Sequence, residues 1–180
     1  MWPIVAVVLL AVVVLFVVYV ARKPDEFAVQ READFAAPPD VVFAQVNDFH
    51  AWEAWSPWAK LDPSSVATFD GAPSGPGAKF AWSGNKKVGE GRMTIVDSKP
   101  AEFVKIKLEF IKPFAATNET LFTFTPRAGG THVTWRMSGR SPGFMHKAIC
   151  MLMNMDKMVG RDFEKGLASM KQIAEAKATG

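Results

Sequence analysis

The chain begins with a strongly apolar run that carries no charge. Residues 2–21, WPIVAVVLLAVVVLFVVYVA, are followed at once by Arg22 and Lys23. A helix rises about 1.5 Å per residue, so this run would extend roughly 30 Å, the thickness of the hydrocarbon core of a bilayer. No basic residue precedes the run, and it is longer than the apolar core of a signal peptide. The pattern therefore predicts an uncleaved transmembrane anchor.

After the anchor, the pattern changes to the periods of strands and short helices. Alternating apolar positions predict a strand over residues 27–36. Pro38-Pro39-Asp40 is typical of the first turn of a short helix. Residues 47–58 predict a second short helix or helical turn, which Ser56-Pro57 would end. The Gly-, Pro- and Ser-rich residues 71–77 predict an irregular connection.

From residue 80 onward, short runs of alternating apolar and polar residues follow one another, separated by turn residues such as Ala128-Gly129-Gly130. This spacing predicts an antiparallel meander with one apolar and one polar face. After Met93, either Ile95 or Val96 continues the apolar face, depending on whether a bulge shifts the register. Asn118 and Thr120 are the clear polar members of that face. Its apolar members are expected to be Phe80, Trp82, Val104, Ile106, Leu108, Phe110, Phe122, Phe124, Val133, Trp135 and Met137.

The C-terminal segment has the period of a helix. Ser141-Pro142 is typical of a helix start, and apolar residues recur every three or four positions from Met145 to about Ala176. Because Gly160 and Gly166 weaken a continuous helix, we expect a shorter first segment and a regular helix from about Asp156. This helix would cover the apolar face of the sheet. The predicted fold class is α+β, in which a curved antiparallel sheet wraps around one long C-terminal helix.

Charge and cysteine content exclude some classes of protein. The chain has 21 Lys and Arg against 18 Asp and Glu, a net charge of +3, and the basic residues are scattered, which argues against a nucleic-acid groove. The single cysteine, Cys150, cannot form an internal disulfide. Arg22 and Lys23 favour a cytoplasmic location for the domain that follows them. We expect a single-pass protein with an anchor over residues 1–23 and one domain over residues 24–180.

Four local phrases occur in a characteristic order: PPDVVF at Pro38–Phe43, WEAWSPW at Trp52–Trp58, GEGRM at Gly89–Met93 and GRDFEKGL at Gly160–Leu167. Together they resemble the START-like (SRPBCC) superfamily of polyketide cyclase/dehydrases and lipid-transport proteins, from residue 27 to about residue 178. The resemblance implies a helix-grip fold with a cavity between sheet and long helix for an apolar or amphipathic small molecule. It does not imply an enzyme, since this fold hosts carriers, sensors, cyclases and hydrolases.

Candidate catalytic groups are few. Acid–base chemistry needs an ionisable side chain that faces the interior, where burial shifts its pKa. His50 lies near the expected cavity mouth, and Glu90 lies at the start of a strand. No residues have metal-ligand spacing and no phosphate-binding loop occurs, so we expect no metal or cofactor and name no catalytic residue. We expect the remaining candidates to be exposed or on the outer face: His132, His146, Glu109 and Glu119.

Two clusters leave alternatives open. Trp52, Trp55 and Trp58, spaced by three, share roughly one helix face and could fill the core, plug the cavity or face the bilayer. The methionines between Met151 and Met158 could be core or adaptable pocket lining. The predicted ligand-lining set is Trp52, Trp55, Phe80, Trp82, Ile106, Leu108, Phe110, Asn118, Thr120, Phe122, Trp135, Met137, Met155 and Phe163.

The sequence thus favours a membrane-anchored binding protein for a hydrophobic or amphipathic small molecule, such as a lipid or a polyketide-like compound. One alternative is a cyclase or dehydratase of the same fold, which would require His50, Glu90 or Glu119 to point inward. The other is a stress-regulatory interaction module whose cavity is filled by its own Phe and Trp side chains. The volume left between sheet and helix separates this last hypothesis from the other two.

Overall fold

The computed structural model describes residues 2–22, 26–140, 147 and 155–179. Helix α1 (Trp2–Ala21) has the bounds of the predicted apolar run. The window Ile4–Ala21 has a mean hydropathy of 3.4, and only 6% of it is buried by the rest of the chain. This helix is therefore long and apolar enough to span a membrane.

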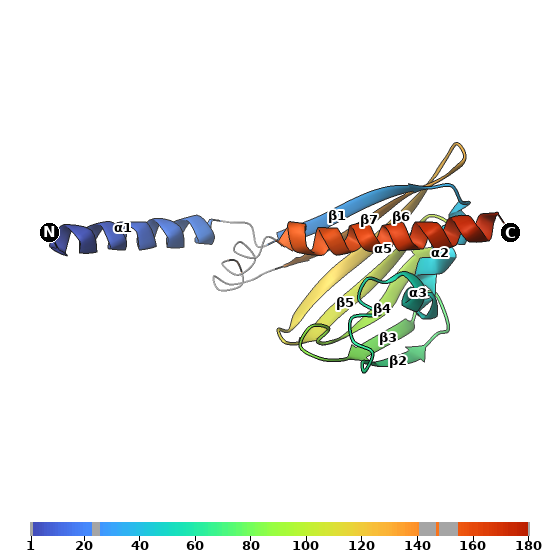
Figure 1. Cartoon of the computed structure of the whole chain (residues 1–180), viewed down its shortest axis with the longest axis horizontal. Coiled ribbons are helices and arrows are strands. Elements are labelled where there is room, and N and C mark those ends of the chain that lie inside the picture. Colours follow the sequence, from blue (N-terminus) through green and yellow to red (C-terminus); the bar gives the residue numbers. More distant parts are fainter. Residues whose placement is uncertain (1, 23–25, 141–146, 148–154, 180) are drawn as a thin grey trace.

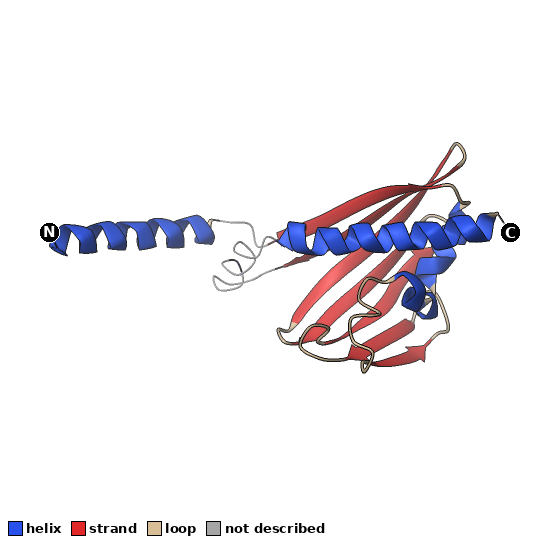
Figure 2. Cartoon of the chain, in the orientation of Figure 1, coloured by secondary structure: helices blue, strands red, loops and turns tan. Residues whose placement is uncertain are grey.

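A seven-stranded antiparallel sheet forms one layer of the domain (Figures 1 and 2). Its order, β1-β7-β6-β5-β4-β3-β2, places the first strand beside the last, while the other neighbours are consecutive in sequence. The strands are β1 (Glu26–Phe35), β2 (Val66–Gly71), β3 (Ala78–Ser83), β4 (Glu90–Lys99), β5 (Phe103–Lys112), β6 (Ala116–Arg127) and β7 (Gly130–Arg140).

One end of the sheet is close to α1 along the chain. We call the end nearer α1 in sequence the proximal end, and the opposite one the distal end. Only four residues separate Ala21, the last residue of α1, from Glu26, the first of β1. Strand pairing places five other strand-terminal residues at the same end of the sheet as Glu26: Ser83, Glu90, Lys112, Ala116 and Arg140.

The helices form the second layer. The short helices α2 (Pro39–Asn47), η1 (Phe49–Ala51) and α3 (Trp52–Trp55) follow β1, as the sequence predicts. Helix α5 (Met155–Ala178) lies along β1 and contacts α2 and α3 (Figure 1). It begins one residue before the predicted position. The predicted earlier segment, including the helix start at Ser141-Pro142, lies outside the described residues.

An arginine fixes α5 on the sheet. Arg31, on the inner face of β1, donates to Glu164 at 2.7 Å and to Asp156 at 3.0 Å. These hydrogen bonds raise the pKa of the guanidinium and lower that of Asp156. A Cβ at Gly160 would overlap the guanidinium, so glycine permits this crossing. The glycine that weakened the helix prediction therefore marks a close contact between helix and strand.

Strands β2 and β4 show where the sequence pattern did and did not predict the sheet. The whole of β2 is exposed, so it has no alternation of buried and exposed residues, and the sequence did not predict it. In β4, Ile95 is fully buried, and a register shift between Ile95 and Asp97 leaves Val96 exposed. The bulge considered from the sequence is therefore present, and Ile95 is the residue that continues the apolar face.

Candidate functional site

Aromatic rings fill the inner face of the sheet beneath α5. Trp135 of β7 stacks on Phe163 of α5 with ring centroids 3.9 Å apart and planes 8° apart. Phe122 stacks on the same indole at 4.8 Å, and the Trp55 and Trp58 rings meet it edge-on at 5.6 and 6.0 Å. With Trp52, these rings form what we call the aromatic cluster: Trp52, Trp55, Trp58, Phe122, Trp135 and Phe163.

The aromatic cluster is part of the hydrophobic core and does not line a cavity. Trp52 and Trp55 are 6% and 1% exposed, and their indole nitrogens donate to the carbonyls of Val46 and Gln45 at 3.0 and 2.9 Å. The structure thus places Trp52 and Trp55 in the core, the first of the three alternatives, while Trp58 is half-buried and packs against it. Five of the predicted lining residues belong to the cluster: Trp52, Trp55, Phe122, Trp135 and Phe163. Ile106 and Thr120 are also buried on this face.

The inner face is less covered toward the proximal end. The first described turn of α5 contacts β1 at Arg31, and Phe27 lies four residues nearer the proximal end of the same strand. Here Phe27, Trp82, Phe110 and Val159 are half-buried, whereas Leu108 and Met137 are buried, at 9% and 5% exposure. This set, the proximal face, contains Phe27, Trp82, Leu108, Phe110, Asn118, Met137 and Val159. Phe80 lies beside Trp82 at a ring distance of 5.9 Å, and the Met155 side chain lies outside the described residues.

Asn118 supplies the polar group of the proximal face. It is 8% exposed, and its Nδ2 donates to the Met137 sulfur at 3.9 Å, a weak interaction. Its amide oxygen occupies the space that a side chain at Gly139 would fill. A buried amide with a weak partner beside half-buried apolar groups can orient an amphipathic ligand.

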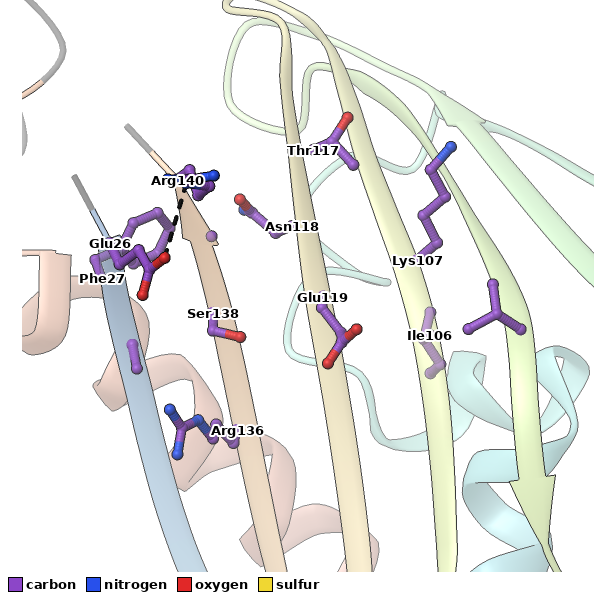
Figure 3. Close-up of a pocket in the computed structure, with 13 residues that line it drawn as sticks. Glu26, Phe27, Ile106, Lys107, Thr117, Asn118, Glu119, Arg136, Ser138 and Arg140 are labelled. Atoms are coloured by element: carbon purple, nitrogen blue, oxygen red, sulfur yellow. Dashed lines mark ion pairs between the residues drawn. The ribbon is translucent and has the colours of Figure 1, made fainter. Parts of the chain in front are cut away.

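The outer face carries a different kind of hollow at the same end of the sheet. A cavity of about 580 Å³ is lined mostly by polar residues of β1, β4, β5, β6 and β7 (Figure 3). Its lining also includes Phe27, Ile106 and Asn118, which belong to the inner face. Glu26 and Arg140 pair across its rim at 3.8 Å. The hollow mixes both charges and lies on the face away from α5, so it is not the apolar cavity predicted between sheet and helix. Its main polar side chains are Glu26, Lys107, Glu119, Arg136, Ser138 and Arg140.

The candidate catalytic groups lie outside the interior. Glu119 pairs with Lys105 at 2.8 Å and Glu90 with Lys112 at 2.6 Å, both on the outer face or edge. The His50 side chain is 58% exposed and lies 2.8 Å from an Asp48 carboxylate oxygen. The enzyme alternative required one of Glu119, Glu90 or His50 to point inward, and none of them does.

Glu109 and His132 are outward, as predicted, and have ion-pair partners. Glu109 accepts from Arg92 at 2.8 Å and Lys107 at 2.9 Å, which lowers its pKa to about 2. The His132 Nδ1 lies 2.7 Å from an Asp34 carboxylate oxygen, and this contact lowers the pKa of Asp34. His146 lies outside the described residues. Within the described part of the chain, no group of three His, Cys, Asp or Glu residues could hold a metal ion.

Comparison with known proteins identifies the family. Residues 26–175 match the family model described as polyketide cyclase / dehydrase and lipid transport. No curated protein matches the chain. A protein of unknown function from Staphylococcus aureus, SA2116, has a TM-score of 0.63 at 14% identity, with 88% of this chain and 99% of that chain covered.

Two further structures share the fold. The di-domain aromatase/cyclase StfQ of the steffimycin biosynthetic pathway has a TM-score of 0.62 at 13% identity, over 86% of this chain and 52% of that one. Protein CV1439 of Chromobacterium violaceum has a TM-score of 0.58 at 14% identity, over 85% and 99%. At such identities these structures support the fold alone. The family match over residues 26–175 carries the assignment, and the chain belongs to the polyketide cyclase/dehydrase and lipid-transport family.

Proposed function

We propose that the chain is a membrane-anchored binding protein for a hydrophobic or amphipathic small molecule, with an anchor over residues 1–23 and a helix-grip domain over residues 24–180. The ligand would lie on the proximal face. One observation carries the proposal: four half-buried apolar side chains lie on the same face as the buried Asn118 amide, whereas every ring of the aromatic cluster except Trp58 is buried. The four are Phe27, Trp82, Phe110 and Val159.

Burial of apolar surface would supply most of the binding energy. At about 25 cal/mol per Å², a ligand that buries roughly 300 Å² of apolar surface gains about 7.5 kcal/mol before the cost of association. Asn118 offers one donor and one acceptor, enough to orient a hydroxyl, carbonyl or headgroup. A lipid or a polyketide-like compound has this combination of a large apolar part and a few polar atoms.

Anchoring would keep the site near the ligand's source. Five Cα–Cα steps join Ala21 to Glu26, so the end of α1 and the start of β1 lie at most about 18 Å apart. The proximal face would therefore lie close to the bilayer surface, where apolar molecules partition. Arg22 and Lys23 favour the cytoplasmic side for the domain.

Native mass spectrometry of the full chain released from nanodiscs, followed by lipid extraction, tests the proposal. We expect one apolar molecule to be retained at fixed stoichiometry. Asn118→Leu keeps the volume and removes the amide, so it should weaken retention by roughly tenfold or less, the value of one hydrogen bond. Thr117→Leu, next in sequence and outward, is the matched control. A chain that stays free of ligand after incubation with lipid and polyketide mixtures would contradict the proposal.

The aromatic cluster favours a second candidate, an interaction module with a filled core. In that case the domain would retain no small molecule, and the Asn118→Leu variant would behave like the control. The same experiment therefore separates the two functions.

A further inference from the structure

A hairpin tip at the proximal end exposes large apolar side chains. Outside α1, Phe114 is the most exposed large apolar residue among the described residues, at 67%, and Ile111 is 45% exposed. Ile111 is the penultimate residue of β5, and Phe114 lies in the connection from β5 to β6. We call Ile111–Phe114 the apolar tip. Single exposed apolar residues are common on protein surfaces, but two together at a hairpin tip with basic neighbours are not explained by chance exposure.

Basic side chains surround the apolar tip. Lys112 lies within it, and the adjacent β3–β4 connection exposes Lys86 and Lys87. The two connections touch, since a Cβ at Gly89 would overlap the Lys112 carbonyl. Figure 1 shows them side by side at the end of the sheet that faces α1. Two carboxylates lie nearby: Glu90 is paired with Lys112 at 2.6 Å, and the buried Asp62 accepts from the Asn85 backbone N–H at 2.7 Å. Lys86 and Lys87 are therefore the exposed charges of the β3–β4 connection.

The distal end has no such feature. Its connections, residues 72–77, 100–102 and 128–129, contain only Ala, Gly, Pro, Ser and Glu. The exposed apolar tip thus occurs at the end that lies within about 18 Å of α1 along the chain. β5 is the third strand from β1 in the sheet, a lateral distance of about 14 Å. Both distances allow the tip to reach the surface of the membrane that α1 would enter.

We propose that the apolar tip inserts into the interfacial region of that bilayer, with Lys86 and Lys87 on anionic headgroups. This inference rests on the proposed anchoring by α1. Apolar side chains next to lysines are the combination that binds such interfaces. The tip is a second point of attachment, and it orients the domain so that the proximal face opens toward the bilayer. A ligand then passes from membrane to site without crossing water.

Quenching by spin-labelled lipid tests the insertion. The full chain carrying Cys150→Ser receives a single cysteine at Ala115, next to the tip, or at Ala128, in the distal β6–β7 turn. Each cysteine is labelled with an environment-sensitive fluorophore in vesicles of phosphatidylcholine with phosphatidylglycerol. We expect acyl-chain spin labels to quench the label at position 115 and not the one at 128. Adding Ile111→Ser and Phe114→Ser should abolish the quenching.

Charge and anchoring are tested separately. Each lysine near an anionic surface contributes about fivefold to the ratio of docked to undocked domain, so Lys86→Gln with Lys87→Gln should lower the quenched fraction. Alkaline carbonate extraction reports whether α1 is inserted. A chain that resists extraction while the label at 115 stays unquenched overturns the tip proposal alone. A chain that is extracted overturns the anchoring on which it rests.

Discussion

Replacement of Phe163 by alanine tests whether the aromatic cluster is a fixed part of the core. The ring is 1% exposed, stacks on Trp135 at 3.9 Å and meets Trp58 edge-on at 6.3 Å. Removing a buried phenylalanine of this kind costs about 3–5 kcal/mol through lost transfer energy and the cavity left behind. For a domain of this size, that corresponds to a fall of roughly 6–20 °C in Tm.

The measurement is urea denaturation of the full chain in detergent, followed by near-ultraviolet circular dichroism, which reports the packed indoles. Phe114→Ala is the matched control, because the phenylalanine at position 114 is 67% exposed. Its removal should change the free energy of unfolding by at most about 0.5 kcal/mol. A loss below about 1 kcal/mol for Phe163→Ala would refute the packed cluster. It would mean that the rings move apart easily and leave room for a ligand beneath α5.

Two further outcomes follow from close contacts and charge. A Cβ at Gly166 would lie 2.8 Å from the buried Trp135 ring, so Gly166→Ala should destabilise the domain by about 1–3 kcal/mol in urea denaturation. Gly160→Ala would displace the Arg31 guanidinium from Asp156 and Glu164, and it should cost less because both carboxylates are largely exposed. Glu109 has its pKa lowered from 4.5 to about 2, first by Arg92, so the stability it adds is present above its unfolded-state pKa and is lost as the pH falls from 4.5 to about 2. Glu109→Gln should flatten the pH dependence of unfolding in that range, and an unchanged profile would contradict the ion pair.

Most of the fold could be predicted because strands with one buried face show alternating apolar and polar residues in the sequence. Residues with buried neighbours on one side, such as Val104 and Ile106, alternate with lysines, and the face of each was predicted correctly. β2 was not predicted because all of its residues are exposed, so its sequence has no alternation of apolar and polar residues. The close contact at Gly160 could not be predicted, since it depends on an arginine 129 positions earlier in the chain.

For the candidate site, the sequence predicted only which residues lie on the inner face of the sheet. Alternation placed Asn118 and Trp135 inward, but it could not separate packed residues from half-buried ones. That division depends on where α5 begins along β1 and on Phe163 stacking over Trp135, which are tertiary facts. The polar face was predicted, but the hollow around Arg136 was not, because outward alternation says nothing about the curvature of the sheet.

The aromatic cluster and the hydrogen bonds of Arg31 to α5 together limit the size of the ligand that the proximal face can hold. The stacked rings of Trp135 and Phe163 close the inner face on the distal side, and Arg31 fixes the first described turn of α5. From Arg31 to Phe27 the strand advances about 13 Å. One leaflet of hydrocarbon is about 15 Å thick, so a full acyl chain would not fit in that depth. We therefore expect the retained molecule to be compact, such as a fused-ring polyketide, or to be an amphipath whose tail stays in the bilayer beside the apolar tip.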